Sequence, residues 1–222
     1  MAIGEALMRL KQLPRCILLI LAQLPVYSQS FLVAQILVGG GVSGNWSSLS
    51  IDNQTPGTSN SVNFGLALGA DGEMRFNDAI ALMARLEYLQ AGTKISFPIN
   101  NGVVISKTRL DYLQALLAIK ASFRMNDFTI FGYVGPGFGY LLAKTNSWDY
   151  SGSIPFGYAH AEIAKTNFTA EFGTGVSYPI LQMLNIFVQV QYSHGLSDIS
   201  TGDLGAIRTR ALHLRTGILL PL

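Results

Sequence analysis

Residues 185–193 read Asn-Ile-Phe-Val-Gln-Val-Gln-Tyr-Ser and alternate between apolar and polar side chains. One face carries Ile186, Val188, Val190 and Tyr192, the other carries Gln189, Gln191 and Ser193, and Phe187 is an exception on the polar face. Alternation with a period of two residues predicts a β-strand whose two faces meet different surroundings.

Seven more segments repeat this alternation. They are residues 62–76, 79–89, 113–123, 128–142 and 168–178, an opening segment from Leu32 to Val38 and a closing segment from Leu212 to Leu220. In each of them one face carries bulky aliphatic and aromatic side chains without a charge, and the other mixes glycine, small residues and charged residues. The sequence therefore predicts eight strands of the same two-faced kind.

The composition indicates that the apolar face meets lipid. Only 13% of the residues are charged, against about 25% in typical soluble domains, and the mean hydropathy is +0.33. A soluble sandwich or a lipocalin would instead bury the bulky face. A membrane-spanning helix needs about 20 apolar residues, whereas a tilted transmembrane strand needs only about 9–11. The net charge of +2 and the absence of a basic cluster in the sequence argue against nucleic acid as a partner.

Aromatic residues and connection lengths support the same interpretation. Aromatics recur where the apolar faces end, with Phe76, Phe123, Phe128 and Tyr178 at one level and Tyr88, Tyr140, Phe168 and Tyr192 at the other. Short connections at residues 76–78, 124–127 and 179–184 alternate with long ones at about 45–61, 90–107, 144–158 and 195–206. Such girdles and alternating connections are typical of outer-membrane barrels. We predict an all-β fold, an eight-stranded antiparallel up-and-down transmembrane β-barrel in the bacterial outer membrane, with both termini in the periplasm.

The N-terminal segment has the pattern of a signal peptide. Arg9, Lys11 and Arg15 precede the apolar run of residues 16–22, and Val26-Tyr27-Ser28 resembles a cleavage site. The run is too short to span a bilayer as an anchor. We expect residues 1–28 to be removed, with cleavage after Ser30 as the alternative, and residues 29–222 to form the barrel. Cys16 would leave with the signal peptide.

The inner faces of the predicted strands collect most of the charges that the barrel must bury. Four acids, Asp71, Glu73, Glu87 and Glu171, face the bases Arg85, Lys120 and Arg215, with His213 nearby. An eight-stranded barrel has an interior only just wide enough for side chains. We therefore expect these eight residues to pair with one another, to fill the interior and to close it to ions.

Candidate catalytic residues are few. Ser193, His194, Ser197 and Asp198 could in principle form an activated hydroxyl, and His160 lies near a predicted loop. Adjacent strand residues point to opposite faces, however, so Ser193 and His194 should not meet. The sequence shows no metal-ligand spacing and no phosphate-binding loop, because Gly39-Gly40-Gly41 falls within a strand. We expect neither catalysis nor a cofactor.

Three stretches carry a further pattern: residues 112–120 (YLQALLAIK), 133–142 (YVGPGFGYLL) and 191–199 (QYSHGLSDI). They resemble strands of the PorT-like outer-membrane barrel family of the Bacteroidetes and relatives, with Gln114, Leu116 and Gln191 as departures from the usual acid, proline and arginine. The resemblance implies the barrel fold, and some members of that family take part in protein secretion or gliding.

The expected function is that of a small non-enzymatic outer-membrane barrel with a structural or binding role carried by its external loops. An accessory subunit of a secretion or transport complex and a lipid A-modifying enzyme are the alternatives. The expected partners are outer-membrane lipid with lipopolysaccharide and, in the second case, an envelope protein complex.

Overall fold

A computed structural model describes residues 35–51, 59–99, 102–151, 163–181, 183–200 and 206–222. The strands are β1 (Gln35–Ile51), β2 (Ser59–Arg75), β3 (Ile80–Ile99), β4 (Gly102–Met125), β5 (Phe128–Ser151), β6 (Thr166–Leu181), β7 (Leu184–Gly195) and β8 (Ile207–Pro221). Within these ranges no helix is long and apolar enough to cross a membrane. The predicted signal peptide and the start of the first predicted strand, with Leu32 and Ala34, lie outside the described residues.

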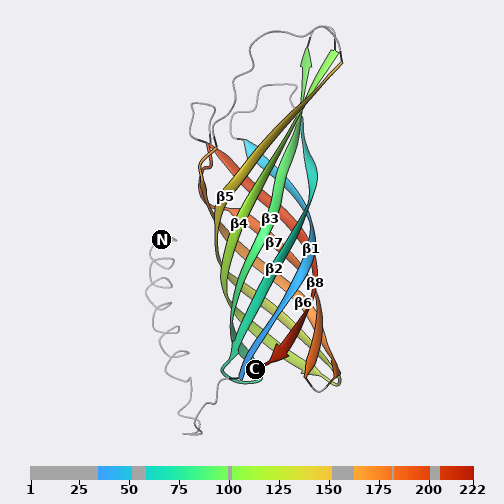
Figure 1. Ribbon diagram of the computed structural model, residues 1–222, viewed down its shortest axis with the longest axis vertical. Helices are drawn as coiled ribbons and strands as arrows, with labels where there is room; N and C mark the ends of the chain where they lie inside the picture. The colour runs from blue at the N-terminus through green and yellow to red at the C-terminus, as the bar shows by residue number, and fades with distance from the viewer. Residues whose placement is uncertain (1–34, 52–58, 100–101, 152–162, 182, 201–205) are drawn as a thin grey trace, which may run out of the picture. The chain divides into compact units, whose positions relative to one another are not determined.

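The eight strands form a closed antiparallel barrel (Figure 1). Each strand pairs with the next along the chain, and β8 pairs with β1 from Leu37 opposite Pro221 to Ile51 opposite Ile207. Closure leaves no free sheet edge in the barrel wall, and lipid cannot satisfy such an edge. The predicted fold class is confirmed.

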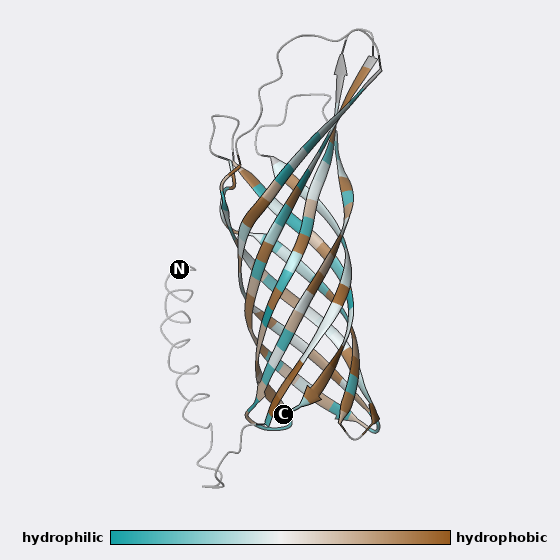
Figure 2. Ribbon diagram, viewed as in Figure 1, coloured by the Kyte–Doolittle hydropathy of each residue, from teal (hydrophilic) through white to brown (hydrophobic). Residues whose placement is uncertain are grey.

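Burial along the strands confirms the predicted faces. On β4 the exposed Leu113, Leu117 and Ile119 alternate with the buried Gln114, Ala118 and Lys120. Hydrophobic and hydrophilic positions alternate along the ribbons in the same way (Figure 2). The bulky apolar side chains therefore point outward, as lipid contact requires.

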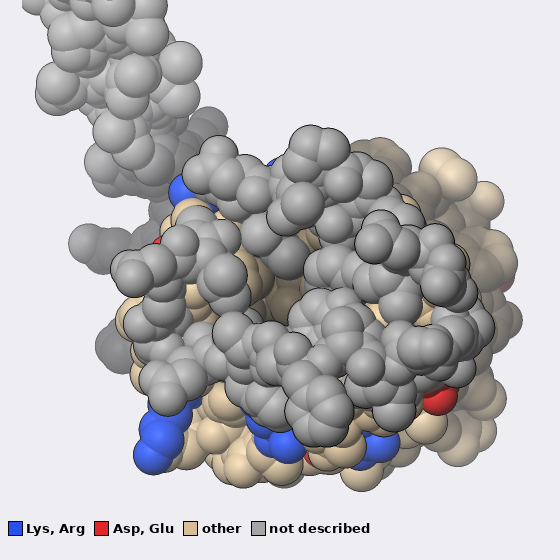
Figure 3. All heavy atoms as spheres, turned by 90° about the horizontal axis from the view of Figure 1, so that it is seen from above, with Lys and Arg blue, Asp and Glu red and all other residues tan. Residues whose placement is uncertain are grey.

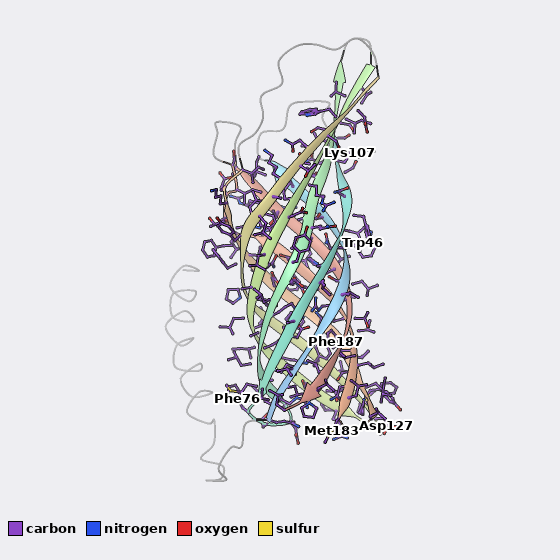
Figure 4. The ribbon with its side chains drawn as sticks, in the orientation of Figure 1. Trp46, Phe76, Lys107, Asp127, Met183 and Phe187 are labelled. Atoms are coloured by element: carbon purple, nitrogen blue, oxygen red, sulfur yellow. The ribbon has the colours of Figure 1, made fainter. Side chains whose placement is uncertain are left out.

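The interior is layered from one end of the barrel to the other. The end that carries the turns β2–β3, β4–β5 and β6–β7, here called the turn end, holds an apolar cluster of Leu37, Met83, Leu116, Ala118, Phe131, Tyr133, Phe187 and Leu219. Near the opposite end, here called the loop end, a second cluster contains Leu49, Ala67, Leu89, Ala91, Leu110, Tyr112, Ile199 and Ile207. Phe187 is thus no irregularity of β7, because it is an inward residue of the first cluster (Figure 4). Polar side chains fill the space between the clusters.

The described parts of three predicted long links are strand, and the predicted bounds of these links are wrong. β1 continues to Ile51, β3 and β4 stay paired up to Ile99 opposite Gly102, and β5 continues to Ser151. As a result β3, β4 and β5 project beyond the rest of the barrel (Figure 1). The alternation of hydrophobicity ends where the strands leave the lipid, although backbone pairing continues. A bulge opposite Asp111 and Tyr112 also shifts the side-chain phase of β5.

The turn-end connections are as short as predicted. Residues 76–79 and 126–127 form turns, and Asn126 has a φ of 54°. Asparagine tolerates this left-handed conformation, which tight two-residue hairpin turns require. The link predicted at 179–184 is even shorter, because β6 ends at Leu181 and β7 begins at Leu184.

Aromatic side chains form both predicted girdles on the outside. At the turn end Phe128 and Tyr178 have ring centroids 5.2 Å apart, and near the loop end Phe138 and Phe168 lie 5.1 Å apart. Trp46 and Phe64, 5.7 Å apart, belong to the loop-end girdle. Figure 4 shows Trp46 well above Phe76. The sequence did not predict this position for Trp46, because residue 46 falls in a segment that was predicted as a link.

Candidate functional site in the barrel interior

All eight predicted interior residues lie inside the barrel, each at most 6% exposed. They come from β2 (Asp71, Glu73), β3 (Arg85, Glu87), β4 (Lys120), β6 (Glu171) and β8 (His213, Arg215). Each has the inward parity of its strand, which is why residues far apart in sequence reach one polar layer. We call the hydrogen-bonded members of this layer, with the neutral side chains described below, the lumen network.

Asp71 bridges two arginines at the centre of the lumen network. Its Oδ1 accepts from Arg85 Nε at 2.6 Å, and its Oδ2 accepts from Arg215 Nη2 at 2.7 Å. Arg215 Nη1 also donates to Glu87 Oε2 at 2.9 Å. The chain Arg85–Asp71–Arg215–Glu87 therefore ties β2 and β3 to β8, across the inside of β1.

Glycine on β1 makes room for the long Arg215 side chain. An added Cβ at Gly41 would lie 3.1 Å from Arg215 Nε and 2.5 Å from the Thr216 backbone oxygen. Arg215 Nη2 also approaches the Gly69 carbonyl oxygen at 3.3 Å. The glycines of the inner face thus set where a guanidinium can cross the interior.

A second ion pair lies nearer the turn end. Lys120 Nζ donates to Glu73 Oε1, and the ammonium lies 4.1 Å from the centroid of the Phe131 ring. Arg75 Nε is 3.8 Å from the other Glu73 oxygen. The Lys120 cation is therefore held both by a carboxylate and by an aromatic face.

Glu171 does not pair with a base, which corrects the expectation that all four acids would do so. Its Oε1 accepts from Gln114 Nε2 and from Thr169 Oγ1, the latter at 3.0 Å, and its Oε2 accepts from Gln191 Nε2 at 2.7 Å. Strand register places neutral amides, not a cation, against this carboxylate. The eight residues hold four carboxyl groups and three bases besides His213, and Glu171 is the acid that no base among them contacts.

Neutral side chains join the two halves of the lumen network. Gln191 Oε1 accepts from Arg85 Nη1 at 2.6 Å and from the Tyr133 hydroxyl at 2.7 Å. Gln189 Nε2 donates to that hydroxyl at 2.9 Å. The sequence places these residues on the inner face but gives no signal for their contacts, because cross-barrel proximity depends on shear and register.

His213 lies beside the network without joining its ion pairs. Its Nε2 has no hydrogen-bond partner among the described residues, and the same holds for Asn45 Oδ1, which lies on the opposing β1 residue. Buried polar atoms of this kind are commonly satisfied by water.

Two cavities lined by described interior residues are small. One of about 20 Å³ lies towards the loop end beside Tyr112, Ser193 and Thr209, and one of about 10 Å³ lies beside Lys120 and Phe131. A single water molecule needs about 10–15 Å³. In these places the interior therefore has room for individual water molecules and not for a solute.

Comparison with known proteins places the chain in a family. The family model described as "Outer membrane protein beta-barrel domain" matches residues 22–201. The chain belongs to this family.

One solved structure agrees on the fold of this family member, and a second is reported for comparison. The outer membrane protein OprG from Pseudomonas aeruginosa is 12% identical, with 85% of this chain and 96% of that chain covered and a TM-score of 0.52. Neisserial surface protein A is 16% identical, with 83% and 97% covered and a TM-score of 0.45. No curated protein sequence matches the chain. The family and the fold locate the protein in the bacterial outer membrane, as predicted.

The serine and histidine near the end of β7 do not meet in this outer-membrane barrel. Ser193 is inside and 5% exposed, whereas His194 is on the outer face, where its ring stacks beside Tyr192 with centroids 6.2 Å apart. Ser197 Oγ accepts the Phe168 N–H, and Asp198 accepts the N–H groups of Ser200 and Ile207. These backbone donors lower the pKa of Asp198 because they stabilise its charged form.

The remaining candidates are His160 and a possible metal site. His160 lies outside the described residues. Among those that are described, no group of three or more His, Cys, Asp or Glu side chains could hold a metal ion.

Proposed function

We propose that this protein is a closed, non-enzymatic outer-membrane barrel that works through its outer surface and its parts outside the membrane. The observation that carries the proposal is the lumen network, in which Asp71 is held by two arginines and Glu171 by three neutral donors. Side chains that are bonded across the barrel from four or more strands cannot move aside independently. The proposed role is structural or binding, without a cofactor.

Energetics favour a barrel that stays closed. Separating a buried ion pair leaves charges without a partner in a medium of low dielectric constant, at a cost of about 3–5 kcal/mol for one lost partner. A conducting path past Arg215 would have to disrupt its contacts with both Asp71 and Glu87. The apolar clusters above and below the polar layer add two further barriers to ions.

Planar-bilayer recording tests the closed barrel directly. We expect wild-type protein to show no steady unitary conductance and Arg215→Ala to show leakage. The control is Arg210→Ala, which removes an exposed, outward-facing arginine of the same strand. A large, stable conductance of the wild-type monomer would refute the proposal and favour a porin.

A role as an accessory subunit of a secretion or transport complex is the second candidate. It is favoured by the PorT-like pattern in β4, β5 and β7 and by the projection of β3, β4 and β5, which offers a protein-binding surface beyond the lipid. Purification of the full chain in mild detergent separates the candidates. A stoichiometric envelope protein in the preparation supports the second, and lipid alone supports the first.

A lipid A-modifying enzyme is the least supported alternative, because Ser193 and His194 lie on opposite faces of the wall. Lipid A mass spectra from a deletion strain test it, and we expect no change. Outer-membrane lipid with lipopolysaccharide remains the proposed partner class, and nucleic acid is not proposed.

A further inference from the structure

An apolar groove of about 460 Å³ crosses the outer wall of the barrel. One row of its lining residues lies in register across five neighbouring strands: Val188, Thr216, Val42, Leu68 and Tyr88. Five strands about 4.8 Å apart give the groove a length of about 19 Å. We call it the outer groove.

A glycine lines the middle of the outer groove. Gly44 on β1 points outward, between Leu66 on β2 and Leu214 on β8. A Cβ added there would meet only the Phe64 ring, at 3.0 Å. Because Gly44 has no side chain, the Phe64 ring packs close to β1 here, and a larger side chain at this lining position of the groove would displace that ring.

The outer groove rises from the lipid interior to the external interface. Its Val188 end is only four residues from the start of β7 at the turn end. Its other end is Tyr88, a member of the loop-end girdle. An apolar chain lying in the groove would therefore bring its polar end to the external boundary of the membrane.

Cations stand directly above this upper end. Arg109 lies opposite Gly92 and Lys94 lies opposite Lys107 on the outward face of β3 and β4, four and six residues beyond Tyr88 on β3. We call these three residues the rim cations, and Figure 4 shows Lys107 on the projecting strands above Trp46. Arg109 pairs with Asp111 at 2.9 Å and Lys107 with Asp149 at 2.7 Å, which leaves the group one positive charge in excess.

We propose that the outer groove and the rim cations together bind one phosphorylated lipid of the outer leaflet. One acyl chain lies in the groove, and a phosphate lies among the rim cations. A groove that opens to hydrocarbon accepts an apolar chain, and cations at the membrane surface attract anionic headgroups. Seen from above, Lys and Arg atoms reach the outer margin of the barrel (Figure 3).

A second copy of the chain fits this surface less well. Two-fold related copies present the same patch to each other, so the rim cations of one copy would face those of the other. A lipid phosphate instead supplies the negative charge that the surface lacks. The proposal rests on the lipid partner class proposed above and gives it a site. Its failure and the failure of the closed barrel are distinguishable, since a leaking barrel could bind the same lipid.

The experiment is a titration of the folded full chain in detergent with bisphosphorylated lipid A, followed by native mass spectrometry. The groove variant is Gly44→Leu, and its control is Gly72→Leu, an outward glycine where an added Cβ has nothing within 4 Å. The rim variant is Lys94→Gln, and its control is Arg210→Gln. Val42→Phe with the control Val134→Phe repeats the groove test if Gly44→Leu does not fold.

We expect wild type to retain one lipid. Lys94→Gln should weaken binding about fivefold, the effect of about one charge at a membrane surface, and Gly44→Leu about tenfold, the effect of losing contact with about two methylenes. Controls should stay within about twofold, and dephosphorylated lipid A should bind to wild type at least as weakly as bisphosphorylated lipid A binds to Lys94→Gln.

Three results would overturn the proposal. The first is equal loss in each variant and its control. The second is displacement of the lipid by inorganic phosphate alone, which would mean that the groove contributes nothing. The third is a dimer that disappears in Gly44→Leu, which would assign the groove to a second copy.

Discussion

The two faces of the barrel wall differ in how much the identity of each residue matters. On β8 Arg215 is 1% exposed and holds Asp71 and Glu87, whereas its neighbour Leu214 is 48% exposed and faces lipid. The inner face is a set of specific cross-barrel bonds, and the outer face is largely a surface of interchangeable apolar groups. The inner face therefore determines how the strands pack around the interior, while the outer face determines that the barrel is surrounded by lipid. Three substitutions test this difference, from the largest expected effect to the smallest.

Removing the central arginine should cost the most. Arg215→Ala removes one charged hydrogen-bond partner from Asp71 and one from Glu87. We expect the free energy of unfolding to fall by about 3–5 kcal/mol. Urea titration of the barrel folded in lipid vesicles measures it. Arg210→Ala on the outer face of the same strand should cost at most about 1 kcal/mol, and similar losses for both would contradict the comparison.

A charge placed on the lipid face should cost nearly as much. Leu117→Arg should destabilise the barrel by about 2–4 kcal/mol near the middle of the bilayer. Gln114→Arg adds the same side chain on the inner face beside Glu171, which lacks a cation, so we expect a smaller loss. The same urea titration compares them. If the two variants lose equal stability, the assignment of the faces is wrong.

The smallest effect should come from removing one hydroxyl. Tyr133→Phe deletes the group that donates to Gln191 and accepts from Gln189, at a cost of about 1–3 kcal/mol for buried groups left unsatisfied. Tyr140→Phe, on the exposed girdle, should change the unfolding free energy by no more than about 0.5 kcal/mol. A larger loss at Tyr140 would show that interface anchoring outweighs the lumen network.

Most of the barrel could be predicted from the sequence, because the alternation of side chains along each strand shows which face meets lipid and which face lines the interior. Period-two patterns identified eight strands, the lipid face of Val188, and the inward parity of all eight charged or titratable lumen residues. These are local properties, set by side chains that alternate across one strand. The patterns failed where the outward face carries polar residues such as Lys94 and Lys107 in place of apolar ones, which is why the upper parts of β3, β4 and β5 were predicted as links.

The sequence by itself determined which residues enter the lumen, and only the tertiary structure decided which of them meet. Gln191 and Arg85 are bonded although 106 positions separate them in the chain. Such contacts depend on the stagger of the strands around the closed barrel, which no single strand encodes. For the same reason the sequence did not show that Glu171 contacts neutral side chains instead of a base. The outer groove likewise depends on the pairing of five strands, because the residues that line it share no pattern within any one strand.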